Sequence, residues 1–187
     1  MLVGSELVAA ARDYALEMHA GLVRPNKKRE PYSVHTTGVA ALVEQSGGSS
    51  EEIAAGHLHD TLEDTKATRE EIRRRFGDVV ATLVEGLTDP SDYEGMPTLA
   101  RKTLQAERVR GKSTGVKRCK LADTIHNLLS VAEDPPVKWD RQKCLDYIEG
   151  ARRVGTECLG ISPFLDAEFH AAHAAVLANI DRHYPTV

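Results

Sequence analysis

The chain has 187 residues, of which 41% are hydrophobic and 28% charged, and its formal net charge at pH 7 is −4. This length and composition are typical of a folded domain with a full apolar core, and they exclude a disordered or fibrous chain. The negative balance argues against a general nucleic-acid binder, which usually carries a surplus of Lys and Arg on one face.

The N-terminal residues lack the basic region of a secretory signal, and no segment approaches the roughly 20 apolar residues that a membrane-spanning helix needs. The cysteines, Cys119, Cys144 and Cys158, are odd in number and lack the spacing of a zinc ribbon. We therefore expect free, mostly buried thiols, no membrane partner and a cytoplasmic location. The sequence leaves the oligomeric state open.

Helical periodicity runs through almost the whole chain, and strand patterns are essentially absent. Capping boxes, Ser49 with Glu52 and Thr68 with Glu71, mark two helix starts. The expected helices are, in chain order, 7–18, 34–43, 50–63, 68–76, 79–87, 99–109, 116–129 and two closing helices within about 137–184. The expected loops lie near 21–31, 46–49, 89–97, 111–114 and 133–137. With no internal repeat and no low-complexity linker, the pattern predicts one all-α domain over residues 1–187.

The first of these loops holds a basic cluster, "RPNKKR" at residues 24–29. It contains Arg24, Lys27, Lys28 and Arg29 and is interrupted by proline. Because the net charge of the chain is negative, an anionic substrate must be bound by a local group of cations, and this loop is the candidate. An ordinary solvated loop is the alternative interpretation.

The stretch "HLHDTLEDT", residues 57–65, gathers ionisable residues where an apolar helix leaves the core. On a helix, His59 lies near Glu63, and Asp60 lies near both Glu63 and Asp64. Carboxylates this close raise one another's pKa or destabilise the fold unless a cation lies between them. A divalent metal bound by His59 and Asp60 would remove the conflict. It would leave Glu63 and Asp64 within reach of a water at the metal.

Two adjacent ligands cannot fill a coordination sphere, so further ligands must come from other helices. His35 lies at the start of a predicted helix, and Asp123 lies among apolar residues, where an unpaired carboxylate is costly to bury. Each has an alternative: His35 could be a core histidine with satisfied hydrogen bonds, and Asp123 could pair with Lys120 or Arg118. The other histidines examined are not expected as ligands: His57, His126, His170 and His173.

Together these pieces resemble the HD superfamily of metal-dependent phosphohydrolases, whose pattern is H…HD…D. More closely, they resemble the hydrolase domain of RelA/SpoT-type alarmone enzymes and the small alarmone hydrolases. The matching blocks are "KKREPYSVHTTGVA", "GHLHDTLEDT", "FGDVVATLVEGLT" and "KLADTIHNL", in that order. The family-like core covers about residues 10–132. The resemblance implies an HD-domain helical bundle.

The resemblance also implies roles for individual residues. The metal ligands would be His35, His59, Asp60 and Asp123. Glu63 and Asp64 would orient or deprotonate the attacking water. The substrate contacts would be Lys27, Tyr32 and Asn127, and the basic loop offers Arg24 as a further candidate. The substrate in that family is guanosine tetra- or pentaphosphate, which is cleaved at its 3′ end to release pyrophosphate.

The chain departs from the family pattern at four positions. Asn26 stands at a usual arginine, Arg29 at a usual glycine, Thr36 at a usual proline, and Thr124 at another usual arginine. The loss of the two arginines leaves the expected metal chemistry intact. It puts recognition of guanine and phosphate in question.

Imidazole and carboxylate ligands with open water positions suit a six-coordinate ion, and we expect Mn²⁺, with Fe²⁺ or Zn²⁺ as alternatives. The expected reaction is in-line attack of an activated water on phosphorus. Two other functions stay open. One is an HD-type nucleotidase or phosphatase acting on another nucleotide, and the other is a non-catalytic nucleotide-sensing module.

Overall fold

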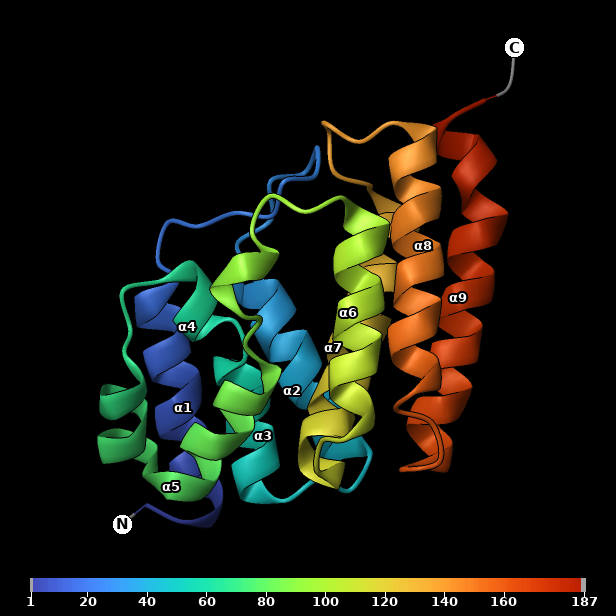
Figure 1. Ribbon diagram of the computed structural model, residues 1–187. Helices are drawn as coiled ribbons and strands as arrows, with labels where there is room; N and C mark the ends of the chain where they lie inside the picture. Colours follow the sequence, from blue (N-terminus) through green and yellow to red (C-terminus); the bar gives the residue numbers. More distant parts are fainter. Residues whose placement is uncertain (1, 186–187) are drawn as a thin grey trace.

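The computed structural model describes residues 2–185, and within them α-helices joined by loops form the fold (Figure 1). The helices are α1 (Gly4–Met18), α2 (Ser33–Gln45), α3 (Ser50–Leu58), α4 (Thr61–Asp64), α5 (Arg69–Leu87), the 3-10 turn η1 (Ser91–Tyr93), α6 (Thr98–Arg110), α7 (Thr114–Glu133), α8 (Arg141–Thr156) and α9 (Pro163–His183). In the described part of the chain, β structure is limited to one isolated antiparallel bridge between Val23 and Pro31. The all-α prediction is therefore confirmed.

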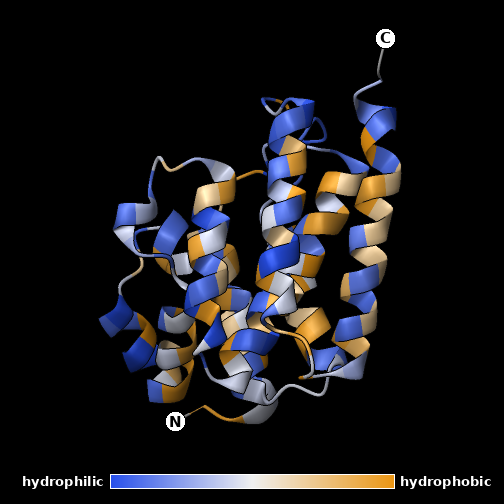
Figure 2. Ribbon diagram, turned by 45° about the vertical axis from the view of Figure 1, so that its right-hand side comes forward, coloured by the Kyte–Doolittle hydropathy of each residue, from blue (hydrophilic) through white to orange (hydrophobic). Residues whose placement is uncertain are grey.

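Helix α7 is the centre of the packing. It contacts α2, α3 and α5 as well as α8 and α9, while α6 packs against α8 and α1 against α3. Its side chains Leu121, Ile125 and Leu128 are fully buried, and burying each removes enough apolar surface from water to stabilise the fold by about 1.5–3 kcal/mol. Figure 2 shows apolar and polar residues sharing each of the longer helices, as the periodicity predicts.

The capping box at the start of α3 is present as predicted. The Ser49 hydroxyl accepts a hydrogen bond from the Glu52 amide, and the Ser49 amide donates to the Glu52 carboxylate over 2.9 Å. The expected helix 50–63 was too long, however, because α3 ends at Leu58 and the short α4 begins at Thr61. His59 Nδ1 donates to the Gly56 carbonyl over 2.9 Å, and that carbonyl would accept the next amide if the helix continued.

The expected separation of helices 68–76 and 79–87 is confirmed at Gly77. Its backbone has φ of 87° inside α5, so the helical path is interrupted there. A residue with a side chain adopts this left-handed region only at a cost, whereas glycine adopts it freely. The break lets the two halves of α5 lie in different directions.

The C-terminal part forms α8 and α9, the two closing helices expected after the Pro135-Pro136 pair. Figure 1 shows them side by side at one end of the molecule, with α1, α3 and α5 at the other. The three cysteine side chains are completely buried and unpaired, as expected. Among the described helices, none has the length and apolar character needed to cross a bilayer.

Candidate metal centre and its cleft

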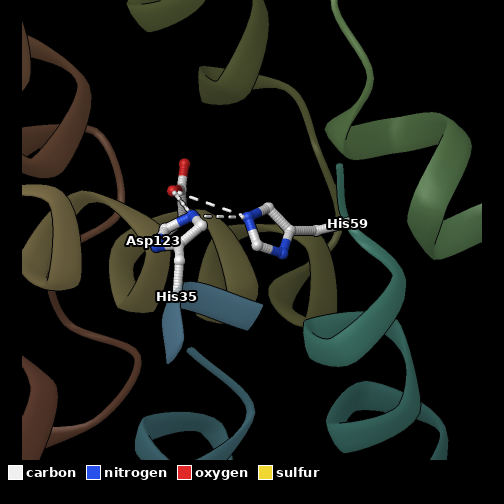
Figure 3. Close-up of side chains that lie close together, drawn as sticks. All are labelled: His35, His59 and Asp123. Carbon is white, nitrogen blue, oxygen red and sulfur yellow. Dashed lines mark hydrogen bonds and ion pairs between the residues drawn. The ribbon is translucent and has the colours of Figure 1, made fainter. Parts of the chain in front are cut away.

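Three ionisable side chains from separate elements meet in the interior. His35 comes from the first turns of α2, His59 from the end of α3, and Asp123 from the middle of α7. Their ligand atoms all lie within 4.8 Å of one another, and the three residues are only 1%, 3% and 6% exposed. Figure 3 shows the three side chains pointing toward a common point. This cluster is a candidate site for a divalent metal ion.

The histidine tautomers suit metal binding. The Nε2 atoms of His35 and His59 lie 3.1 Å apart. His59 Nδ1 carries a proton, because it donates to the Gly56 carbonyl, so a metal ion would be bound through Nε2. Such an arrangement, in which one ring nitrogen is fixed by a hydrogen bond and the other is presented to an ion, is common around metals. Two lone pairs at this separation repel unless a proton or cation lies between them, so the donor set fits a metal ion.

Asp60 lies at the edge of the cluster. Its Oδ2 atom is 3.0 Å from His59 Nε2 and 3.4 Å from His35 Nε2, and it accepts a hydrogen bond of 2.7 Å from the Tyr32 hydroxyl. Burial works against its charge, but the neighbouring histidines hold its pKa well below the ordinary value. Asp60 is therefore an ionised oxygen donor beside both imidazoles.

Asp123 lies in the candidate cluster and also pairs with a lysine, as one of the alternative interpretations expected. One carboxylate oxygen lies 3.4 Å from His35 Nε2 and accepts from Asn127 Nδ2 over 2.5 Å. The other oxygen pairs with Lys120 Nζ at 3.1 Å. Burial works against the charged form, but Lys120 and the histidines hold the pKa of Asp123 well below its usual range. The alternative pairing with Arg118 is absent, since that guanidinium pairs with Glu52.

Glu63 and Asp64 lie on α4 and line the same cleft as the cluster. Burial, followed by the charge of Asp60, raises the pKa of Glu63 to about 7 even though its Oε1 accepts a 2.6 Å hydrogen bond from the Asp89 amide. Burial and Asp60 also raise the pKa of Asp64. A carboxylate with a pKa near neutrality exchanges protons efficiently at neutral pH. Glu63 therefore has a pKa suited to a proton-transfer group.

A cleft of about 340 Å³ opens over these residues and is here called the central cleft. Of the residues expected to contact the substrate, Arg24, Tyr32 and Asn127 line it, and Lys27 does not. Lys27 lines a neighbouring cleft instead. Arg24 donates a 2.7 Å hydrogen bond to Asn127, which itself donates to Asp123.

The sequence interpretation missed several residues of the central cleft. They are the cations Arg101, Lys102 and Lys120 and the aromatic residues Trp139 and Tyr147. Lys102 is only 5% exposed and lies over the Tyr147 ring, 5.0 Å from its centroid. Burial and then the like charge of Lys120 lower its pKa to about 8. Lys102 lies on the buried face of α6 with Gln105 and Val109. The sequence could have indicated this residue, because a lysine at helical spacing from buried positions must have a partner.

His126, which was not predicted to be a metal ligand, contacts His35 of the cluster. Its Nδ1 atom lies 3.1 Å from His35 Nδ1. When His35 offers Nε2 to an ion, its Nδ1 carries the proton and donates to His126. The His126 ring lies against Gly38 of α2, where an added Cβ would come within 2.2 Å of it. Gly38 therefore makes room for the group that orients His35.

We expect Gly38→Ala to displace His126 and weaken metal binding. Loss of a hydrogen bond behind a metal ligand typically costs about 10- to 100-fold in affinity, and overpacking typically costs about 1–3 kcal/mol of stability. Metal affinity, measured by competition with a chromophoric chelator, and thermal unfolding check both effects. Gly111→Ala is the matched control, because φ there is −88° and nothing lies within 4 Å of the added Cβ. Metal affinity equal in the two variants would contradict this role for His126.

The HD domain family matches residues 11–149, which is most of the chain, and the chain belongs to this family. It is 34% identical to guanosine-3′,5′-bis(diphosphate) 3′-pyrophosphohydrolase MESH1 of Xenopus tropicalis over 164 residues, covering 87% of this chain and 90% of that protein. It is 35% identical to the human protein of the same name over 156 residues, covering 81% and 86%. A solved structure of a metazoan ortholog of SpoT that hydrolyzes ppGpp matches with a TM-score of 0.83 and 25% identity over 100% of both chains.

Proposed function

We propose that this protein is a metal-dependent hydrolase that removes the 3′-pyrophosphate of guanosine tetra- or pentaphosphate. The observation that carries the proposal is the meeting of His35, His59 and Asp123 beneath a cleft that is lined by both carboxylates and basic side chains. The activity named for the MESH1 relatives, which align with the chain over most of their length, supports it.

In this proposal His35, His59, Asp60 and Asp123 hold one divalent ion. Their two imidazoles and two carboxylates fit Mn²⁺, with Fe²⁺ and Zn²⁺ as alternatives. When bound, the ion polarises a phosphoryl oxygen and lowers the pKa of the attacking water.

The residues of the chain provide the remaining functions. Glu63 and Asp64 accept the proton of the water that attacks the phosphorus next to the 3′ oxygen. The water oxygen bonds to that phosphorus as its bond to the 3′ oxygen breaks, the 3′ oxygen takes up the proton that the carboxylates accepted, and the pyrophosphate so formed dissociates. Lys102 and Lys120 line the cleft where negative charge develops and stabilise it.

The nucleoside would lie between the aromatic residues and the Arg24–Asn127 pair. Tyr147 of α8 and Trp139 of the preceding segment line the cleft, and bases stack well on aromatic surfaces. Arg24 contacts Asn127, and Asn127 contacts Asp123, so the binding groups are connected to a proposed ligand. The free buried thiols are consistent with the proposed cytoplasmic location.

The test is a product assay on metal-free protein with Mn²⁺, Fe²⁺ or Zn²⁺ added back. Guanosine tetraphosphate, guanosine pentaphosphate and ordinary nucleoside monophosphates are incubated separately, and phosphorus NMR identifies the products. Pyrophosphate from the first two substrates supports the proposal. Orthophosphate from the monophosphates alone would instead indicate a nucleotidase, and tight binding without turnover would indicate a sensing module.

A further inference from the structure

The stretch between α7 and α8, residues 134–140, forms part of the central cleft and is here called the cleft segment. Asp134, Pro136 and Trp139 of this segment line the cleft. The segment is neither helix nor strand, so its path is not fixed by regular backbone hydrogen bonding. The position of the Trp139 side chain therefore depends on contacts that the segment makes with other parts of the chain.

The first of these contacts lies where the cleft segment leaves α7. The carbonyl of Ala132, in the last turn of α7, would accept a hydrogen bond from the amide four residues later in a continuing helix. That residue is Pro136, which has no amide hydrogen. His183, the last residue of α9, donates from its Nε2 atom to the Ala132 carbonyl over 2.9 Å instead. The end of α9 thus satisfies a carbonyl that the proline leaves without its helical partner.

The second contact lies where the cleft segment enters α8. The hydroxyl of Tyr184, the residue that follows α9, donates to the Trp139 carbonyl over 2.9 Å. Because a carbonyl can only accept, the hydroxyl hydrogen is directed to Trp139, and the hydroxyl oxygen accepts from the Cys144 thiol over 3.3 Å. Cys144 is completely buried near the start of α8. The backbone of Trp139 is therefore linked through Tyr184 to the core.

Both contacts come from the C-terminal end of α9. Figure 1 shows this end of α9 at the same end of the molecule as the start of α8. A third contact holds the middle of the cleft segment, where the Val137 amide donates to the Pro25 carbonyl over 2.9 Å. The match to the HD domain family ends at residue 149, before α9 begins. The two ends of a segment that lines the cleft are thus held by residues outside the matched region.

We propose that His183 and Tyr184 are positioning residues, which hold the cleft segment so that Trp139 is already ordered at the wall of the central cleft when the nucleotide binds. The identity of the nucleotide rests on the proposed function. A side chain that is mobile in the free protein must be immobilised by the ligand, and this reduces affinity. Both residues lie outside the set of described residues that line the cleft, so they affect binding through Trp139 and leave the chemical step unchanged.

The first test needs no nucleotide. Trp139 is the only tryptophan in the chain, so time-resolved fluorescence anisotropy measures the motion of this side chain alone. Tyr184→Phe keeps the ring and removes the hydroxyl, so the fast rotation of Trp139 should increase in amplitude, and Tm should fall by roughly 2–4 °C. Ile72→Val is the matched control. It removes one methylene from a fully buried residue of α5 and should lower Tm similarly without changing the anisotropy.

The second test measures turnover. KM for guanosine tetraphosphate should rise by about 2- to 10-fold in Tyr184→Phe, with kcat and metal content unchanged, because only the ordering of the cleft is lost. KM should not change in Ile72→Val. His183→Leu should raise KM in the same way, whereas His183→Gln should restore the KM of the unmodified protein, since its amide nitrogen can replace the Nε2 donor.

The two tests separate this proposal from the proposed function. Greater Trp139 motion in Tyr184→Phe, with no nucleotide hydrolysed by any variant, would refute the proposed function and support the positioning role of Tyr184. Unchanged Trp139 motion and unchanged KM in Tyr184→Phe would overturn the positioning role even in a fully active protein. An equal rise of KM in Ile72→Val would also overturn it, because loss of stability alone would then explain the effect.

Discussion

Asp123→Asn should abolish the metal-induced rise in thermal stability together with turnover. In the unmodified protein, a metal ion at 100 times its Kd stabilises the fold by about 2.7 kcal/mol, which for a chain of this size corresponds to roughly 5–10 °C in Tm. The variant removes an oxygen donor from the centre of the cluster, so this rise should vanish. Calorimetry with and without Mn²⁺, and elemental analysis of the same preparations, check it.

The informative measurement is the change in Tm on adding the metal ion, rather than Tm itself. Asp123 also pairs with Lys120, and a buried ammonium that loses its partner destabilises the metal-free fold as well. Glu149→Gln is the matched control, since its carboxylate pairs with Arg152 and Arg153 on α8, away from the cluster. Full metal content in Asp123→Asn would refute the assignment of Asp123 as a ligand.

Glu63→Gln and Asp64→Asn should keep the metal and lose turnover. Both side chains line the cleft next to the cluster without belonging to its three-residue centre. General-base catalysis is typically worth about 10²- to 10⁴-fold, so kcat should fall within that range while substrate binding persists. Since each change removes a negative charge beside a phosphorylated ligand, affinity should stay the same or increase slightly. Near-normal kcat in both variants would mean that another group activates the water.

The pH profile gives a second measurement on the same variants. The pKa of Glu63 is raised to about 7, and a general base acts only when it has lost its proton. At saturating metal, kcat should therefore fall as pH decreases, with a midpoint at or below pH 7, because a bound cation favours the ionised carboxylate. In Glu63→Gln, the residual kcat should no longer fall in this way as the pH decreases. A pH profile unchanged by the substitution would mean that a different group causes the fall in kcat.

Much of the fold follows from local rules that operate within a few residues. Apolar spacing predicted the helices, and the Ser49 capping box fixed the start of α3. The end of α3 was missed because it depends on a side-chain hydrogen bond, from His59 to the Gly56 carbonyl, rather than on periodicity. Such competition between side chain and backbone is not visible in an apolar pattern.

The sequence predicted the cation-binding chemistry of the site better than it predicted the residues that surround the site. The carboxylates of "HLHDTLEDT" indicated a cation, and the sequence offered His35 and Asp123 as further candidate ligands. That they share one site depends on how α2 packs against α7, which only the family resemblance indicated. The positions of Lys27 and Lys102 relative to the clefts depend on loop paths and on the contact between α6 and α8, which no local pattern specifies.

The two walls of the central cleft come from different parts of the chain. His35, His59 and Asp123 belong to α2, α3 and α7, whereas Trp139 and Tyr147 belong to the segment that begins after the proline pair and to α8. The residues of the metal cluster and the aromatic pair thus belong to separate stretches of the sequence. Substitutions in the later stretch can therefore change the aromatic lining of the cleft without replacing any residue of the candidate metal cluster.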